Sequence, residues 1–334
     1  MIISRTPFRV SLFGGGSDYP QWYRAHGGAV MGFAINKYCY ISLRRLPPFF
    51  EHKHRIVYSK IETVAELSEI QHPAVRNVLQ EMKVECGVEI HHDGDLPARS
   101  GLGSSSSFVV GLLNALYALD GRMVSKHQLA EQAIHIEQNV IAEHVGSQDQ
   151  IWAAYGGMNR IDFLEDGSFQ VVPALVKPGR RAALQSHLML FFTGISRFAS
   201  LVAEKKIAAL EAHTRHIRTM VAMVDESLSI LGNDNTPITQ IGTLLGEAWA
   251  LKRDLTDAVS TPEIDAIYQA AMDAGALGGK LLGAGGGGFM LFFVAPHKQQ
   301  AVREKLAPLI EVQFDIDHGG SKIVVYEPEG LANC

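Results

Sequence analysis

Residues 96–107 place two glycines and four consecutive serines directly before a long apolar segment, and this feature constrains the chain most. Glycine has no Cβ, so Gly101 and Gly103 let backbone N–H groups come close to a bound anion. From Phe108 to Leu119 apolar residues recur at helical spacing, so the serines open a helix. A helix N-terminus attracts negative charge through its free N–H groups and its dipole. The segment therefore predicts a polyphosphate-binding loop, and the alternative, a Gly/Ser linker, does not explain the apolar helix.

Length and charge limit the classes of protein that fit. The chain has 334 residues, more than the roughly 250–300 at which single cores divide, so two domains are expected. The net charge is −5 and no long Lys/Arg block occurs, which argues against a nucleic-acid partner. No signal peptide and no apolar run of about 18 residues is found, so no membrane association is expected. Three widely spaced cysteines predict no disulfide framework and favour a cytoplasmic protein.

Periodicity and turn residues divide the chain into strands and helices. Strands are expected at residues 2–12, 29–43, 88–92, 158–163, 168–172, 187–193, 289–294, 311–316 and 322–326. Helices are expected at 62–86, 105–119, 126–145, 199–231, 239–257, 261–275 and 297–307, with Ser125 capping the third and Gly146 ending it. Prolines and a glycine near residue 178 mark a boundary, which predicts domains over residues 1–178 and 179–334.

Two common phosphate-binding motifs do not fit this chain. The Walker motif needs Ser or Thr after its lysine, whereas Leu281 follows Lys280. Residues 283–288 satisfy G-x-G-x-x-G, but this loop is expected to follow a helix and enter a strand, the reverse of the dinucleotide-binding context. Two interpretations of it stay open, a tight turn and a glycine wall beside the phosphates or the substrate.

Three glycine-rich segments, at residues 5–20, 97–107 and 280–290, occur in this order. Together they resemble the three motifs of the GHMP kinase superfamily, which includes galactokinase, homoserine kinase, mevalonate kinase and phosphomevalonate kinase. The resemblance implies an α+β, two-domain GHMP-kinase fold, with an N-terminal ribosomal-protein-S5-like α/β domain and a C-terminal ferredoxin-like α+β domain. Residues 136–159 most resemble the bacterial D-glycero-D-manno-heptose 7-phosphate kinases.

The resemblance implies an ATP- and Mg²⁺-dependent kinase that transfers the γ-phosphoryl group to a sugar hydroxyl. The subgroup suggests the anomeric hydroxyl of D-glycero-D-manno-heptose 7-phosphate. A kinase of another sugar such as fucose or galactose, a kinase of a non-sugar alcohol, and a non-catalytic ATP- and sugar-binding sensor remain alternatives. The expected partner is a small-molecule sugar or sugar phosphate, and both a monomer and a homodimer are compatible with the sequence.

The resemblance also assigns roles to individual residues. It implies that ATP is bound by Gly101, Leu102, Gly103, Ser104, Ser105, Ser106 and Ser107, and that the substrate is contacted by Gly16, Ser17, Asp18, Gly156, Gly157, Gly286 and Gly287. Ser105 and Glu137 would bind Mg²⁺, since a hydroxyl and a carboxylate together with phosphate oxygens suit this hard cation. Asp149 and Arg9 would be catalytic. Asp149 would act as a base or orient the acceptor hydroxyl, and Arg9 would stabilise transition-state charge because it cannot share a proton.

Ordinary structural roles compete with these assignments. Asp18 can form an Asx turn, Glu137 can face solvent on a helix, and Arg9 can be a charge at a strand edge. The histidines at positions 52, 54, 91 and 92 lack metal-site spacing and are expected in loops or at strand ends. An anion site for a phosphorylated substrate has as candidates Arg44, Arg45, Arg99, Arg160, Arg197 and Lys280. The adenine pocket is expected on residues 35–59.

Overall fold

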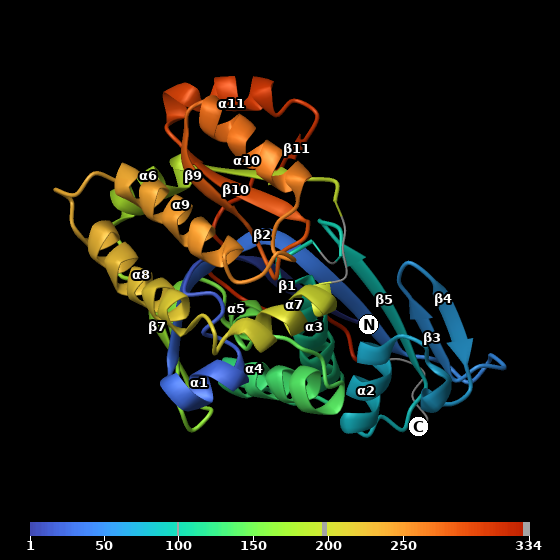
Figure 1. Cartoon of the computed structure of the whole chain (residues 1–334). Helices are drawn as coiled ribbons and strands as arrows, with labels where there is room; N and C mark the ends of the chain where they lie inside the picture. Colours follow the sequence, from blue (N-terminus) through green and yellow to red (C-terminus); the bar gives the residue numbers. More distant parts are fainter. Residues whose placement is uncertain (99, 196–198, 330–334) are drawn as a thin grey trace.

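The computed structural model describes residues 1–98, 100–195 and 199–329. It contains two sheets, one of eight strands and one of four, with helices packed on both (Figure 1). In the described part of the chain, no helix is long and apolar enough to cross a membrane.

The large sheet is organised around β2 (Gly28–Arg45), a single long strand that pairs along its length with β1 (Ile2–Phe13). One end of β2 also pairs with β5 (Val88–Gly94), and the other end pairs with β6 (Met158–Phe163). The remaining strands are β3 (His54–Val57), β4 (Ile61–Val64), β7 (Phe169–Pro173) and β12 (Lys322–Tyr326). The strand order is β12-β1-β2-β5-β3-β4, with β7 beyond β6.

Helix α3 (Ser104–Leu119) packs on β1 and β2, because its apolar residues are buried over most of its length. Gly111 permits the close approach, since a Cβ there would lie 2.9 Å from Thr6 Oγ1, and Ser4 Oγ donates to its carbonyl oxygen at 2.8 Å. The same region contains α1 (Pro20–His26), α2 (Pro73–Glu81), α4 (Lys126–His135) and α5 (Gln148–Tyr155).

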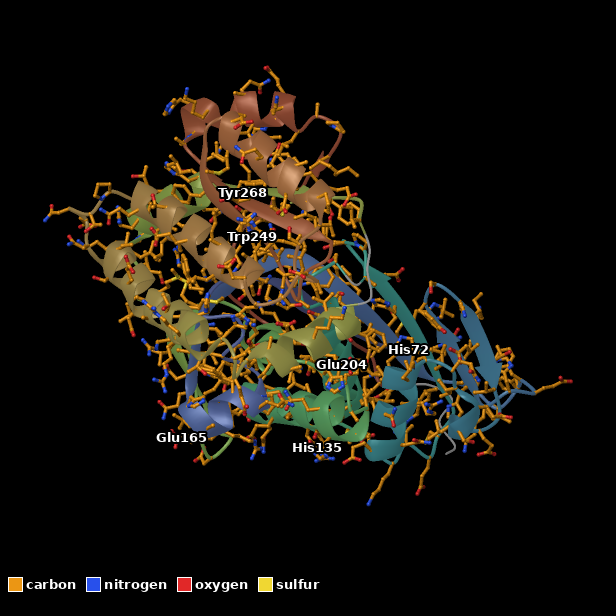
Figure 2. The ribbon with its side chains drawn as sticks, in the orientation of Figure 1. His72, His135, Glu165, Glu204, Trp249 and Tyr268 are labelled. Atoms are coloured by element: carbon orange, nitrogen blue, oxygen red, sulfur yellow. The ribbon has the colours of Figure 1, made fainter. Side chains whose placement is uncertain are left out.

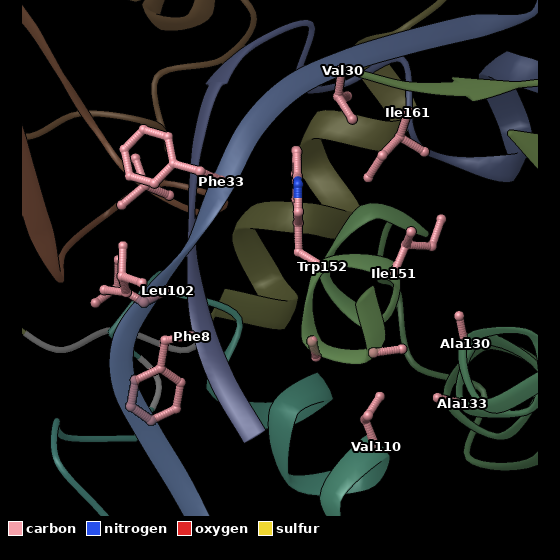
Figure 3. Close-up of a cluster of buried hydrophobic side chains, with 14 of the residues drawn as sticks. Phe8, Val30, Phe33, Leu102, Val110, Ala130, Ala133, Ile151, Trp152 and Ile161 are labelled. Carbon is pink, nitrogen blue, oxygen red and sulfur yellow. The ribbon is translucent and has the colours of Figure 1, made fainter. Parts of the chain in front are cut away.

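Helix α5 is fixed by Trp152, which is fully buried in the core shown in Figure 3. Gly32 of β2 makes room for this ring, because a Cβ at that position would lie 3.0 Å from two of its carbons. The indole therefore packs directly on the backbone of the central strand and holds the first turn of α5 at a defined place.

The second sheet has the antiparallel order β11-β8-β10-β9, and its central strand β10 (Phe289–Val294) is buried at every residue. Its other strands are β8 (Leu188–Phe192), β9 (Ala276–Leu281) and β11 (Ile310–Glu311). The helices that follow residue 177 are α6 (Pro178–His187), α7 (Ala199–Ala209), α8 (Thr214–Gly232), α9 (Thr239–Arg253), α10 (Pro262–Asp273) and α11 (Gln299–Lys305). Trp249 of α9 and Tyr268 of α10 lie next to each other beside this sheet (Figure 2), with ring centroids 6.3 Å apart.

Several expected elements differ from the structure. The helix expected at 62–86 is wrong in its first half, which forms β4 and a 3₁₀ turn at Leu67–Glu69 before Pro73 opens α2. The helix expected at 126–145 leaves the α conformation after His135, because a π-helical turn, η2 (Ile136–Val140), follows. The pattern at 199–231 is two helices, and α1, α5, α6, β3 and β9 were not predicted. Since β9 precedes residues 283–288, this loop joins two antiparallel strands rather than a helix and a strand.

The last strand does not belong to the second sheet, although it follows it in sequence. β12 pairs with β1 in the large sheet, so residues 322–326 lie beside the first strand of the chain. The division at residues 178 and 179 stays a prediction.

Cys39 is a free, buried thiol, whereas Cys86 is disulfide-bonded, which its isolated position in the sequence did not indicate.

Candidate active site

Two of the predicted glycine segments meet through their backbones. A Cβ on Gly101 would lie 2.6 Å from the carbonyl oxygen of Leu282, and one on Gly283 would lie 2.5 Å from Gly101 Cα. Gly288 is equally close, since its Cβ would lie 2.2 Å from the carbonyl oxygen of Ser100. Glycine is needed at these positions because any side chain would separate the two loops.

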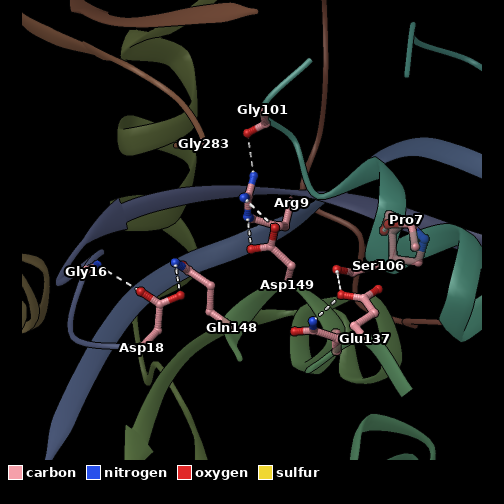
Figure 4. A network of polar contacts seen from close by, with 12 residues as sticks. Pro7, Arg9, Gly16, Asp18, Gly101, Ser106, Glu137, Gln148, Asp149 and Gly283 are labelled. Carbon is pink, nitrogen blue, oxygen red and sulfur yellow. Dashed lines mark hydrogen bonds and ion pairs between the residues drawn. The ribbon is translucent and has the colours of Figure 1, made fainter. Parts of the chain in front are cut away.

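Arg9 of β1 joins the first of these loops, which contains Gly101 and Leu102, to helix α5. Its backbone N–H donates to the carbonyl oxygen of Leu102 at 3.0 Å, and its Nη1 donates to that of Gly101 at 2.6 Å. The other guanidinium nitrogens bind Asp149 in a bidentate ion pair, Nε to Oδ1 and Nη2 to Oδ2, both at 2.8 Å (Figure 4). Arg9 is buried, whereas the Asp149 side chain is 24% exposed. The carboxylate therefore has a fixed orientation and still faces open space.

Asp149 also lies directly beside the predicted phosphate loop. Gly103 has a φ of +75°, and a Cβ there would lie 3.4 Å from Asp149 Oδ2. Gly103 is the N-cap of α3, so the free N–H groups of the first turn of α3 begin next to this carboxylate. An anion bound at this helix end and an acceptor held by Asp149 would be close neighbours.

Asp18 is the second carboxylate near α5, and unlike Asp149 it is buried. Its Oδ1 accepts from the Gly16 N–H at 2.8 Å, and its Oδ2 accepts from Gln148 Nε2 at 2.7 Å. Gly146 packs on it, because a Cβ there would lie 1.9 Å from Oδ2. Asp18 is 2% exposed, so its two oxygens are positioned by the loop and by α5 together.

Glu137 is the third carboxylate, and it lies in the π-helical turn η2. It is 1% exposed, and its Oε2 accepts from Ser106 Oγ at 2.9 Å and from Gln150 Nε2 (Figure 4). Its Oε1 is buried and has no hydrogen-bond partner among the described residues. Burial raises the pKa of Glu137 to about 8, although the hydrogen bonds from Ser106 and Gln150 lower it. An unpaired buried carboxylate oxygen is costly, and a cation at this place would remove the cost.

The donor set therefore fits a hard divalent cation of the kind predicted from the sequence. Glu137 supplies one carboxylate oxygen, and the hydroxyl of Ser106 in the first turn of α3 lies next to it. The serine in contact with Glu137 is Ser106, whereas Ser105, the predicted ligand, is exposed. Ser107 faces the sheet, and its Oγ donates to the carbonyl oxygen of Pro7 at 2.8 Å. Ser107 therefore anchors the start of α3 to β1, and its hydroxyl does not face a ligand.

Three of the predicted substrate residues make contacts that stabilise the fold. Ser17 is fully buried, and its Oγ makes hydrogen bonds with the backbone of Gly14 and Ala29, so it stabilises the loop. Gly156 packs against Gly320, from which a Cβ would lie 2.2 Å, and Gly157 N–H donates to the carbonyl oxygen of Asp317 at 2.6 Å. These contacts give the C-terminal segment 317–320 a structural role that its sequence did not suggest.

The glycine loop at 285–288 is held by contacts with neighbouring segments. Gly286 N–H donates to the carbonyl oxygen of Val259 at 2.9 Å, and a Cβ on Gly287 would lie 2.4 Å from that of Ile195. Two buried lysines brace its approach: Lys252 Nζ donates to the carbonyl oxygen of Gly283 at 2.6 Å, and Lys280 Nζ to that of Leu12 at 2.7 Å. Neither lysine was predicted as a support.

Two of the four described candidates for a separate anion site, Arg44 and Arg160, are paired with acids. Arg44 donates to Glu89 at 2.6 Å, and Arg160 donates to Asp162 at 2.7 Å. Arg99 and Arg197 lie outside the described residues. No group of three or more His, Cys, Asp or Glu side chains suited to a metal ion occurs in the part of the chain described.

Sequence reasoning missed two residues that organise the site, Gln148 and Gln150. They flank Asp149 in the first turn of α5 and donate to Asp18 and Glu137, respectively. The available signal was two glutamines on either side of a candidate catalytic aspartate. The roles of the two glutamines could not be assigned before the helix was known, because the helix sets the directions in which the three neighbouring side chains point.

The comparisons with known proteins identify the family. Residues 68–157 match the GHMP kinases N terminal domain, and residues 235–308 match GHMP kinases C terminal. The chain is 29% identical over 311 residues to the D-glycero-alpha-D-manno-heptose 7-phosphate kinase of Campylobacter jejuni, covering 89% of this chain and 91% of that protein. It is 26% identical over 343 residues to the galactokinase of Pyrococcus furiosus, covering 91% and 92%.

A solved structure gives the same result for the fold. The D-glycero-D-manno-heptose 1-phosphate kinase from Bacteroides thetaiotaomicron matches with a TM-score of 0.70 at 23% identity, over 96% of this chain and 98% of that one. At this identity the likeness concerns the fold alone. Both domain patterns are present in order, and the glycine loops they contain pack against each other, the first of them bonded to Arg9. The chain belongs to the GHMP kinase family.

Proposed function

We propose that this protein is an ATP- and Mg²⁺-dependent sugar-phosphate kinase that phosphorylates the anomeric hydroxyl of D-glycero-D-manno-heptose 7-phosphate. The observation that carries the proposal is the bidentate Arg9–Asp149 pair beside Gly103, at the start of the serine-rich helix. The name of the Campylobacter jejuni relative supports the choice of acceptor.

The donor phosphates would lie at the N-terminus of α3. Backbone N–H groups at the start of α3 that make no intrahelical hydrogen bond would hold them, because a helix N-terminus has such donors and a positive dipole end. Arg9 is held at this loop by its bond to the carbonyl oxygen of Gly101, so its charge is positioned before any ligand binds. A preorganised cation of this kind stabilises charge that develops on a transferring phosphoryl group.

Asp149 would orient the acceptor hydroxyl toward the donor. Both of its oxygens accept charge-assisted hydrogen bonds from Arg9, which hold the carboxylate in one orientation beside the loop. Arg9 does not take part in proton transfer, because a guanidinium stays protonated at neutral pH. This arrangement supports an orienting role for Asp149, in line with phosphoryl transfers in which positioning provides most of the catalysis.

Glu137 would hold the metal through its Oε1, with a serine hydroxyl of the first turn of α3 as a second ligand. A cation held there would supply neutralisation of the negative charge on the donor phosphates. The protein's own contribution is to keep Oε2 occupied by Ser106 and Gln150, so that a single oxygen is available.

A panel of free and phosphorylated sugars, incubated with ATP and Mg²⁺, tests the proposal through ADP release. Heptose 7-phosphate should give the highest kcat/KM, and ³¹P NMR should show the new phosphate at the anomeric position. If fucose or galactose were the preferred acceptor, the kinase activity would stand and the proposed substrate would be wrong. Background ADP release across the whole panel would refute a kinase.

A non-catalytic sensor on the same fold is the competing function, and Asp149→Asn separates the two. For a kinase, the variant should lose about a hundredfold or more in kcat while binding ATP normally. Asp162→Asn is the matched control, because Asp162 pairs with Arg160 on β6 rather than with Arg9. A sensor would bind both ligands, and neither variant would change its negligible turnover.

A further inference from the structure

The first turn of α5 contacts three separate groups of the site through three consecutive residues. Gln148 donates to Asp18, Asp149 pairs with Arg9, and Gln150 donates to Glu137. Successive residues of an α-helix point about 100° apart, so the three side chains of one turn reach Asp18, Arg9 and Glu137 in three different directions. Figure 4 shows Gln148 and Asp149 reaching different partners from this turn.

Gln150 occupies the most buried place in this turn. It is fully buried, and its Nε2 shares Glu137 Oε2 with the hydroxyl of Ser106. Two donors therefore converge on one carboxylate oxygen, and the other oxygen, Oε1, has no partner among the described residues. This asymmetry fixes which oxygen of Glu137 a cation would meet.

The amide orientation of Gln150 follows from the chemistry of its partner. A carboxylate oxygen accepts hydrogen bonds, so the NH₂ group must face Glu137, since the amide oxygen would be repelled there. The amide oxygen is left buried with no hydrogen-bond partner in the described structure. An apolar side chain of similar size would avoid that unpaired acceptor, so packing alone does not account for a glutamine at this position.

We propose that Gln150 is a positioning residue for the metal site: together with Ser106 it holds Glu137 Oε2, so that Oε1 alone is presented to the nucleotide-bound cation. This inference rests on the proposed function in one respect, that Glu137 binds the cation. It makes Gln150 act through Glu137 and not through contact with substrate.

The test measures cation binding without turnover. Mn²⁺ is titrated into the full-length protein saturated with a non-hydrolysable ATP analogue, and bound Mn²⁺ is followed by electron paramagnetic resonance. Gln150→Met removes the donor at nearly constant length and should weaken Mn²⁺ binding about tenfold, as expected when a partner of a metal ligand is lost. Binding of the metal-free analogue should stay within twofold of wild type.

Gln132→Met is the matched control, because this partly buried glutamine bonds to Met82 and Tyr117, away from the site. It should leave Mn²⁺ binding unchanged. If Gln150→Met does not fold, Gln150→Asn replaces it, since the shorter side chain fits the same space and its amide falls short of Glu137. The Mn²⁺ spectrum of either variant should also broaden, because an unfixed carboxylate gives a less uniform site.

The possible results separate this inference from the proposed function. Wild-type Mn²⁺ affinity and an unchanged spectrum in the Gln150 variant would overturn the positioning role, whatever the wild-type protein phosphorylates. A wild-type protein that binds the Mn²⁺–nucleotide but phosphorylates nothing would refute the kinase and leave the Gln150 result valid. A wild-type protein that binds no Mn²⁺ with the nucleotide would overturn both.

Discussion

Arg9 and Asp149, 140 residues apart in the chain, form a bidentate ion pair with both hydrogen bonds at 2.8 Å. The pair connects the first strand of the large sheet to the first turn of α5, and Arg9 extends the connection to Gly101. Three segments that are distant in sequence thus depend on one guanidinium.

Arg9→Lys should lower kcat about a hundredfold with a small change in the KM for ATP. Lysine retains the charge but cannot make the planar two-point bond to Asp149 and the bond to Gly101 together, so the orientation of Asp149 is lost. Steady-state kinetics measure the effect. Arg160→Lys, which alters a guanidinium–aspartate contact on β6, should leave kcat within twofold. Equal losses in both variants would contradict a specific role for Arg9.

Gln148→Met should raise the KM for the sugar acceptor about tenfold and leave nucleotide binding unchanged. The variant removes the donor to Asp18 Oδ2, and the freed carboxylate can rotate away from its present orientation. Acceptor titrations at saturating ATP, together with calorimetry of the ATP analogue, separate the two effects. An unchanged acceptor KM would show that Asp18 is positioned by its own loop.

Gly288→Ala should destabilise the folded protein by about 3 kcal/mol. The φ of Gly288 is +106°, and a Cβ there would lie 2.2 Å from the carbonyl oxygen of Ser100. Gly121→Ala is the control, because Gly121 also has a positive φ, +67°, but no atom lies within 4 Å of its Cβ position. It should cost only about 1 kcal/mol. Urea unfolding of both variants measures the difference, and equal losses would show that the contact between the loops is not tight.

Glu89→Gln should reduce the free energy of unfolding at pH 7 by about 1–2 kcal/mol. Burial alone would raise the pKa of Glu89, but hydrogen bonds from His91 and Arg44 outweigh it, and the net pKa is lowered. Because the folded pKa lies below the unfolded value of about 4.3, this stabilisation is complete above that value and is lost as the pH falls through the folded pKa.

The difference between wild type and Glu89→Gln should therefore be constant from pH 7 to about pH 5 and should disappear at lower pH. Urea denaturation at several pH values provides the measurement. Glu85→Gln alters an exposed side chain nearby and should have almost no effect. A difference that grows as the pH falls would contradict the assigned direction.

Most strands and the long helices were predictable because their patterns are local. The apolar run after Ser107 predicted α3, and the run Phe289–Val294 predicted β10. The first half of residues 62–86 was predicted wrongly because β4 is a short edge strand with little periodicity. Helix α5 was missed because Trp152 and its neighbours are buried on several sides, which hides the amphipathic pattern.

The sequence by itself determined the kind of loop, the order of the three glycine segments and the identity of the candidate acids, Asp18, Glu137 and Asp149. The loop and the segment order reside in residue type and spacing, whereas the three acids were assigned through the resemblance to the GHMP kinases. The tertiary structure decided which groups meet: Arg9 with Asp149, Ser106 rather than Ser105 with Glu137, and the glutamines of α5 with two of the acids. Such pairings depend on the π-helical turn at 136–140 and on the orientation of α5, which the buried Trp152 fixes. Long-range packing sets both.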